Sequence, residues 1–288
     1  MENTNYYRKS VDELTFTDDG MFQAVLHDPK ICAELIEKLL HVKVNHVDYP
    51  KLEKPIAPYY SSKGVRLDVY LKDNNKVIDV EMQSSPQEAL GKRTRYYQSM
   101  VDIDSLLKGQ DYTELKDSYI LFICKTDPFE DKDKNHYDLP CYTFRNICTK
   151  NPNVELDDKS LKVIYNASAY KKESNEKIRG FLQYVYTNDP GEDDFSKRLS
   201  KMVERIKNED KFRREYAAMN LHDRDIQRAA KREGIAEGIS VGIKQGSQQK
   251  AIENAMNFLR MKVLTIEQIA QGTGLSVEEV NKLAKEIL

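Results

Sequence analysis

Residues 65–83, which decide the fold, read VRLDVYLKDNNKVIDVEMQ. Apolar and polar residues alternate on either side of Asn74-Asn75, which is the two-residue period of β-strands. Asn tolerates the positive φ angles of a two-residue primed turn, so we predict a β-hairpin that turns at Asn74-Asn75. Such a turn makes Asp73 face Lys76 and sets the pairing of the two strands.

This register gives the hairpin two different faces. The first is apolar and should be buried in the core, with the facing pairs Leu71 and Ile78, Val69 and Val80, and Leu67 and Met82. The second is polar, with the facing pairs Tyr70 and Asp79, Asp68 and Glu81, and Arg66 and Gln83. Two carboxylates, those of Asp68 and Glu81, are therefore directly opposed, with Cβ atoms roughly 5 Å apart.

Two like charges at this distance need compensation. They repel by roughly 3 kcal/mol at an effective dielectric constant of about 20. Mg²⁺ would provide the compensation, because it takes carboxylate oxygens and keeps positions for water and a substrate phosphate. The alternative is a solvent-exposed charge cluster neutralised by Arg66 and Lys76, and spacing alone leaves both interpretations open.

The surrounding segments predict a mixed α/β or α+β domain. Apolar residues from Gly20 to Val42 have helical spacing interrupted near Pro29, which predicts two short helices or one bent helix. A helix over residues 87–108 should end at Gly109, and everything after Glu173 reads as helical. Beyond the hairpin, strands are expected at residues 118–125, 141–144 and 161–165.

Composition narrows the class of protein. The 288 residues carry a formal net charge of −2, with twelve Lys or Arg against six Asp or Glu between Lys197 and Arg232. That stretch is either a solvated helix or a phosphate-facing surface. The four cysteines form no C-x-x-C pair, which argues against zinc, and the polar first residues do not resemble a signal peptide. We therefore expect a cytoplasmic protein with reduced thiols, associated with the nucleoid when it binds DNA.

The order of several short segments resembles a known family. Asp68 followed by Glu81-Met82-Gln83 is similar to the PD-(D/E)XK nuclease signature, with Gln83 in place of the usual lysine. Over roughly residues 16–238 the chain resembles the recombination-promoting nuclease and transposase (Rpn) family of this superfamily. The segments that carry the resemblance are DGMFQ at 19–23, RLDV at 66–69, EMQ at 81–83, RTRYY at 93–97 and GQDY at 109–112.

The resemblance implies a restriction-endonuclease-like core and a bacterial endonuclease that hydrolyses DNA with low sequence specificity. It implies a role in recombination, mobile elements or phage defence, and a cofactor of Mg²⁺, with Mn²⁺ as a substitute. Two alternatives stay open: an inactive nucleic-acid-binding or oligomeric scaffold, and a nuclease that cleaves RNA.

Roles for individual residues follow from the same resemblance. Asp68, Glu81 and the backbone carbonyl of Met82 would hold the metal, and Asp19 could reach it through water, although Asp18 or Asp19 could equally be a helix N-cap. Gln83 would orient the attacking water or a phosphate oxygen, because it cannot be a general base. We expect Asp79 to be a solvated charge rather than a further ligand.

The helix after the hairpin carries the expected DNA contacts. Arg93 and Tyr97 are four residues apart and share a face, near further basic and aromatic residues. These side chains could clamp a phosphate, whereas packing and surface exposure are the alternatives for Tyr97 and Lys92. The predicted DNA-binding residues are Lys92, Arg93, Arg95 and Tyr96.

The C-terminal part predicts self-association. Gly234, Gly238, Gly242 and Gly246 recur every four residues, each followed by Ile or Ser, so a helix here would carry small and apolar residues along one side. A flexible linker is the alternative, since a glycine inside a helix costs roughly 1 kcal/mol relative to alanine.

Capping boxes at 265–268 and 276–279 predict a helix-turn-helix pair, whose acidic second helix suits protein contact better than base reading. The predicted parts are a nuclease core (1–170), a partly basic helical extension (171–232) and an oligomerisation segment (233–288) that forms a homodimer.

Overall fold

The computed structural model describes residues 9–45, 51–56, 65–73, 75–86 and 88–287. The chain divides into two compact units, residues 1–216 and 217–288, and each is described by itself. Helices α4 and α5 of the predicted extension lie in the first unit, together with the sheet. The three-part division by function stays a prediction.

The hairpin forms as predicted. Strands β2 (Val65–Asp73) and β3 (Lys76–Gln83) are antiparallel, and Asp73 faces Lys76. The same register brings Leu71 opposite Ile78, Tyr70 opposite Asp79 and Val69 opposite Val80. The predicted turn residue Asn74 lies outside the described residues.

Within the described ranges, six strands make one mixed sheet, in the order β1-β2-β3-β4-β6-β5. Strand β4 (Asp117–Cys124) is parallel to β3, β6 (Ser160–Asn166) is parallel to β4, and β5 (Cys141–Phe144) is antiparallel to β6. The edge strand β1 (Lys51–Ile56) was missed, because KLEKPI lacks an apolar alternation and contains a proline. Pro55 is tolerable there because an edge strand needs hydrogen bonds on one side only.

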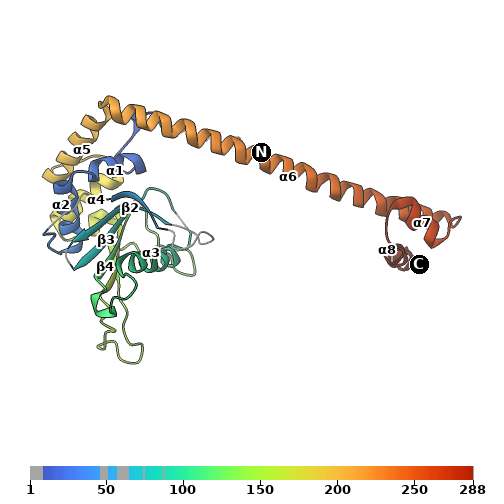
Figure 1. Cartoon of the computed structure of the whole chain (residues 1–288), viewed down its shortest axis with the longest axis horizontal. Helices are drawn as coiled ribbons and strands as arrows, with labels where there is room; N and C mark the ends of the chain where they lie inside the picture. Colours follow the sequence, from blue (N-terminus) through green and yellow to red (C-terminus); the bar gives the residue numbers. More distant parts are fainter. Residues whose placement is uncertain (1–8, 46–50, 57–64, 74, 87, 288) are drawn as a thin grey trace. The chain divides into compact units, whose positions relative to one another are not determined.

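Helices cover both faces of the sheet, which confirms the predicted class (Figure 1). Helices α1 (Asp19–Leu26), α2 (Pro29–Leu40), α4 (Glu176–Thr187) and α5 (Asp194–Lys207) gather on one side, and α3 (Leu90–Ser105) lies on the other. The predicted interruption near Pro29 separates α1 from α2, where the side chain of Asp28 accepts hydrogen bonds from the first backbone N–H groups of α2. Short 3₁₀ helices occur at Val11–Glu13, Tyr112–Glu114 and Ala167–Lys172.

An apolar cluster fills the space between α3 and the sheet. It draws on β2, β3, β4, β5, β6 and α3, and its members are Leu67, Tyr70, Val77, Leu90, Met100, Val101, Ile120, Phe122, Cys124, Tyr142 and Ile164. The prediction for Leu67 was wrong: we expected it to face Met82 on the same side of the sheet as Val69, but it lies with Tyr70 in the cluster under α3. The described β2–β3 pairs run only from Asp73↔Lys76 to Val69↔Val80, so the regular alternation on which the prediction was based ends before Leu67.

The second unit is helical, as predicted. Helix α6 (Asp210–Met261) begins in the first unit and is followed by α7 (Ile266–Thr273) and α8 (Val277–Ile287). Both predicted capping boxes are present, at Thr265 and at Ser276. The three helices share a small core of Ala255, Ile269, Ala270, Leu275 and Val280. Among the described helices, none combines the length and hydropathy that a membrane span requires.

Candidate functional site

The site is built where β2 and β3 cease to pair through their backbones. We call this end of the hairpin, residues 67–69 and 80–83, the fork. The backbone N–H of Asp68 donates to Oε1 of Glu81 at 2.9 Å, and the backbone N–H of Met82 donates to Oδ2 of Asp68 at 3.2 Å. Each carboxylate thus binds the backbone of the opposite strand, so the two predicted acidic residues lie close together.

Burial makes these carboxylates unusual. Burial, reinforced by the charge of Asp19, raises the pKa of Asp68 to about 6, although the Met82 N–H opposes the shift. Glu81 is 4 % exposed, and burial together with the charges of Asp79 and Asp68 holds its pKa well above the ordinary range. A group of acids with raised pKa values is typical of a site that handles cations or protons.

Asp79 lies in the same environment, which corrects our prediction that it is a solvated charge. Its side chain is fully buried, and neither carboxylate oxygen has a hydrogen-bond partner among the described residues. Burial, followed by the charge of Asp68, holds the pKa of Asp79 well above its usual range. Helix α3 covers this face: the hydroxyl of Tyr70, which pairs with Asp79, donates to Asp104 of α3 at 2.9 Å.

The four predicted DNA-binding residues on helix α3 differ in their exposure to solvent. Lys92 and Arg95 are exposed to solvent, whereas Tyr96 packs against the cluster beneath the helix. Arg93 extends to the fork, where Nη2 lies 3.8 Å from Oε2 of Glu81. The structure therefore brings Arg93 to the acidic residues and leaves Lys92 and Arg95 on the surface.

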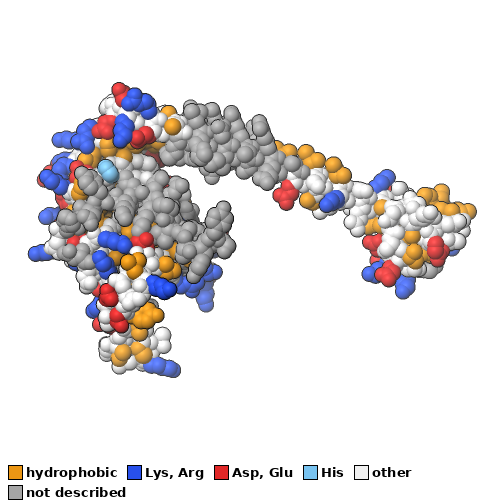
Figure 2. Space-filling model, viewed as in Figure 1, with side chains coloured by type: hydrophobic (Ala, Val, Ile, Leu, Met, Phe, Trp, Pro, Cys, Tyr) orange, Lys and Arg blue, Asp and Glu red, His pale blue; other side chains and the backbone are white. Residues whose placement is uncertain are grey.

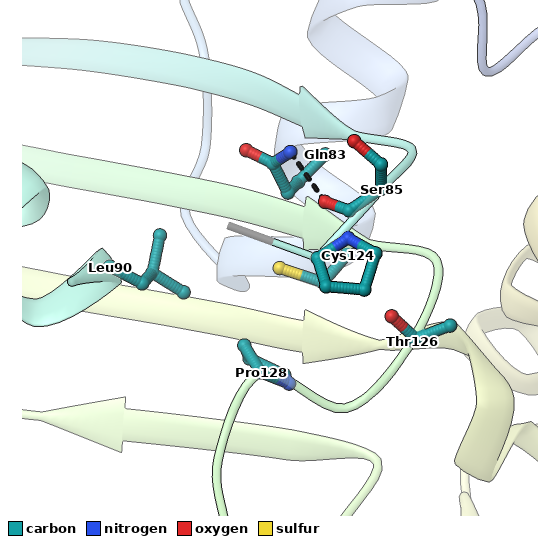
Figure 3. Close-up of a pocket in the computed structure, with 7 residues that line it drawn as sticks. Gln83, Ser85, Leu90, Cys124, Thr126 and Pro128 are labelled. Carbon is teal, nitrogen blue, oxygen red and sulfur yellow. Dashed lines mark hydrogen bonds between the residues drawn. The ribbon is translucent and has the colours of Figure 1, made fainter. Parts of the chain in front are cut away.

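Gln83 is held at both ends of its amide. Its Nε2 donates to the backbone carbonyl of Ser85 at 2.7 Å, and its Oε1 accepts from Nη1 of Arg93 at 2.8 Å. Figure 3 shows it at the wall of a cavity of about 10 Å³, roughly the space of one water. The other lining residues are Ser85, Pro86, Leu90, Cys124, Thr126 and Pro128. A water here would lie beside the amide, whose second N–H remains available to it.

Helix α1 contributes two side chains to Asp68. Gln23 is buried and hydrogen-bonds to Asp68, which lowers the pKa of that carboxyl, whereas the charge of Asp19 raises it. Gln23 was missed as a site residue, although its spacing of four from Asp19 places both on one helix face. Asp18 occupies the N-cap position of α1, but its carboxylate accepts from Thr15 instead of capping the helix.

A divalent cation suits these donors by charge and chemistry. In the described part of the chain, no group of three or more His, Cys, Asp or Glu is already arranged around a common metal position. One carboxylate oxygen of Asp68 and one of Glu81 accept a hydrogen bond from a backbone N–H, while both oxygens of Asp79 are buried without a hydrogen bond among the described residues. Hard oxygen ligands of this kind are those that Mg²⁺ takes, and a cation would offset their burial.

Of three comparisons with known proteins, one found a match. No curated protein and no solved structure matches the chain. One family model, described as PD-(D/E)XK nuclease family transposase, matches residues 21–235, about three quarters of the sequence. The match includes the fork, α3 and Gln83. This chain therefore belongs to the PD-(D/E)XK nuclease family of transposases.

Proposed function

We propose that this protein is a Mg²⁺-dependent endonuclease that hydrolyses phosphodiester bonds in DNA with low sequence specificity. The supporting observation is the fork, where the carboxylates of Asp68 and Glu81 each accept a backbone hydrogen bond from the opposite strand, in a chain of a nuclease family. Membership of the family makes it a nuclease, whereas the metal, the DNA substrate and the low specificity are the proposal.

The residues at and near the fork would have different roles in the reaction. Asp68, Glu81 and the backbone carbonyl of Met82 would hold the cation. When bound, the cation makes a water more acidic and stabilises the charge that develops on the phosphate. Gln83 is rigid because Ser85 and Arg93 bind its amide, and its second N–H can orient the water or a phosphate oxygen. Asp19 adds a carboxylate near Asp68 that can bind a water of the metal shell.

The exposed side chains of α3 support binding without base reading. Lys92 and Arg95 present positive charge at the surface of the helix whose buried face contacts the site. Contacts between such residues and phosphates position DNA but carry no sequence information. A low-specificity nuclease of this kind would act in recombination, mobile-element movement or phage defence, on the nucleoid of a bacterial cytoplasm.

Cleavage of plasmid DNA tests the proposal. The purified protein should cut with Mg²⁺ or Mn²⁺ and stop in EDTA. Asp68→Asn and Glu81→Gln keep the shape of the side chains and should each abolish cutting. The control is Asp133→Asn, an exposed residue of the loop between β4 and β5, which should cut as the wild type does. Undiminished cutting by both fork variants would refute the assignment.

The same assay separates the alternatives. Retention of DNA without metal-stimulated cleavage would favour a binding scaffold, and preferential degradation of a matched RNA would make RNA the substrate. Circular dichroism of each variant distinguishes a lost active site from a lost fold.

We further propose that the protein is a homodimer joined through residues 234–246 of α6. The isoleucines of this segment are exposed, with Ile235 at 53 %, Ile239 at 58 % and Ile243 at 66 %. Figure 2 shows hydrophobic side chains along this described part of the helix. A Cβ at Gly234, Gly238, Gly242 or Gly246 would meet nothing within 4 Å, so each glycine leaves room for a second helix to approach.

A further inference from the structure

Three acidic residues influence one another at the fork and beside it. Asp68 and Glu81 lie in the fork and Asp79 lies next to it on β3, while Gln83, the next polar residue after Glu81, is uncharged. Taking one partner from a buried charged group typically costs several kcal/mol, so a cation on a neighbouring element has a large effect. Arg93 of α3 is such a cation: its charge lowers the pKa of all three carboxylates, although burial raises each pKa more strongly.

Arg93 is fixed by several contacts at once. Nη1 donates to Oε1 of Gln83 at 2.8 Å, and Nη2 donates to the hydroxyl of Tyr97 at 3.1 Å. Nη2 also lies 3.8 Å from Oε2 of Glu81, and the guanidinium lies over the rings of Tyr97 and Phe122, 5.3 and 5.5 Å from their centroids. A planar group held by hydrogen bonds and by aromatic rings is pre-organised, which a lysine in the same position would not be.

These contacts separate Arg93 from a simple phosphate-binding residue. A residue that serves only the substrate presents its donors to solvent, as Lys92 and Arg95 of the same helix do. Arg93 instead directs them to Gln83, Tyr97 and Glu81, and its side chain is 28 % exposed. It binds the two residues of β3 to which we assign metal holding and water orientation.

We propose that Arg93 is a positioning residue of the nuclease centre, which supplies positive charge from α3 at the Glu81–Gln83 end of β3 and holds Glu81 and Gln83 in their working geometry. The inference rests on the proposed nuclease function. It identifies a charge that offsets part of the acidity of the fork before a metal arrives, whereas from the sequence we considered only Mg²⁺ or Arg66 with Lys76 for this role.

Two variants test the inference: one removes the positive charge of Arg93 from α3, and the other also places a positive charge at residue 83 of β3. Arg93→Gln should lower kcat on the order of 100-fold, as removal of one preorganised electrostatic group does, with KM nearly unchanged because Arg93 binds protein groups. The double variant Gln83→Lys with Arg93→Gln puts an ammonium on β3 and should recover at least about 10-fold of that loss. Arg145→Gln, at an exposed arginine paired with Glu155, is the control and should retain wild-type activity.

Thermal unfolding gives a readout besides activity. Without metal, Arg93→Gln should melt below both the wild type and the Arg145→Gln control, because three carboxylates lose their cation. Adding Mg²⁺ should then raise the Tm of Arg93→Gln more than that of the wild type, since the metal replaces the missing charge. Should Arg93→Gln not fold, Arg93→Lys retains the charge without the planar contacts and should show partial activity with the same enhanced response to Mg²⁺.

The outcomes distinguish failure of the inference from failure of the function. Wild-type kcat in Arg93→Gln, a rise in KM alone, or no recovery in the double variant would overturn the positioning role while Asp68→Asn remains inactive. If the wild-type protein does not cut, the nuclease proposal fails. The response of Tm to Mg²⁺ then decides the role of Arg93 by itself, and an equal response in variant and wild type overturns it.

Discussion

The backbone N–H of Asp68 donates a 2.9 Å hydrogen bond to Oε1 of Glu81, so the two acidic residues are joined before any metal is present. This bond stabilises the ionised form of Glu81, whereas burial opposes ionisation more strongly and keeps its pKa high. The hydrogen bond therefore fixes the geometry of the fork, while burial disfavours the ionised form of Glu81. Both its stability and its affinity for cations should depend on pH.

Stability of the metal-free protein should fall as pH rises. The pKa of Asp68 is raised from 3.8 to about 6 in the folded state, so the folded protein binds the proton more tightly than the unfolded chain does. The stabilisation is complete below the unfolded pKa and is lost as pH rises through about 6. Urea denaturation in EDTA across this window should show the loss, and Asp68→Asn should flatten it. An equal slope in the variant would contradict the assignment.

Asp79→Asn should stabilise the metal-free protein at neutral pH. Because the folded pKa of Asp79 is raised well above its usual range, its stabilising contribution at low pH is lost as pH rises, and asparagine has no such loss. The Tm of the variant in EDTA should exceed that of the wild type at neutral pH, and the difference should shrink in acid. A variant less stable than the wild type at both pH values would show that the carboxylate is satisfied.

Lys92 and Arg95 should contribute to DNA affinity through phosphate contacts. Replacing both with Gln should reduce the slope of log K against log salt by about 2 and weaken binding equally for unrelated sequences. Fluorescence anisotropy with a non-cleavable duplex over a salt series measures both effects, with Arg145→Gln as the control. An unchanged slope would remove these residues from the interface.

Gly180 should not tolerate a side chain, because α4 and the start of α5 meet there. A Cβ at Gly180 would lie 2.5 Å from the Cβ of Asp193, whose carboxylate accepts from the backbone N–H of Ser196 and caps α5. Gly180→Ala should destabilise the protein by roughly 1–3 kcal/mol despite its better helix propensity. The control Gly91→Ala, on α3 with nothing within 4 Å, should be neutral or stabilising in the same urea titration.

The exposed isoleucines of α6 should join two copies of the chain. Ile239→Asp introduces a charge into the proposed contact and should convert a dimer to a monomer in sedimentation velocity. Leu156→Asp places the same charge at another exposed apolar residue and should leave the mass unchanged. A dimer that persists in Ile239→Asp would exclude this segment as the interface.

Local chemistry was sufficient to predict most elements. The hairpin register from Val69↔Val80 to Asp73↔Lys76 followed from the Asn pair and the alternation around it, and the break between α1 and α2 followed from Pro29. Strand β1 could not be predicted, because KLEKPI has no strand period and pairs only through its contact with β2. The mixed sheet with helices on both faces agrees with the predicted class.

Alternation and turn chemistry are local properties of a hairpin, so they were sufficient to predict the register from Asp73↔Lys76 to Val69↔Val80 and to place Asp68 and Glu81 close together just beyond it. Three other features arise from tertiary packing: Asp79 is buried, Gln23 reaches Asp68, and Arg93 turns to the fork while Lys92 and Arg95 stay exposed. Those facts depend on how α1 and α3 pack against the sheet. Such packing joins residues far apart in the chain, so a local pattern gives the face of a helix on which a side chain lies but not the strand that it meets.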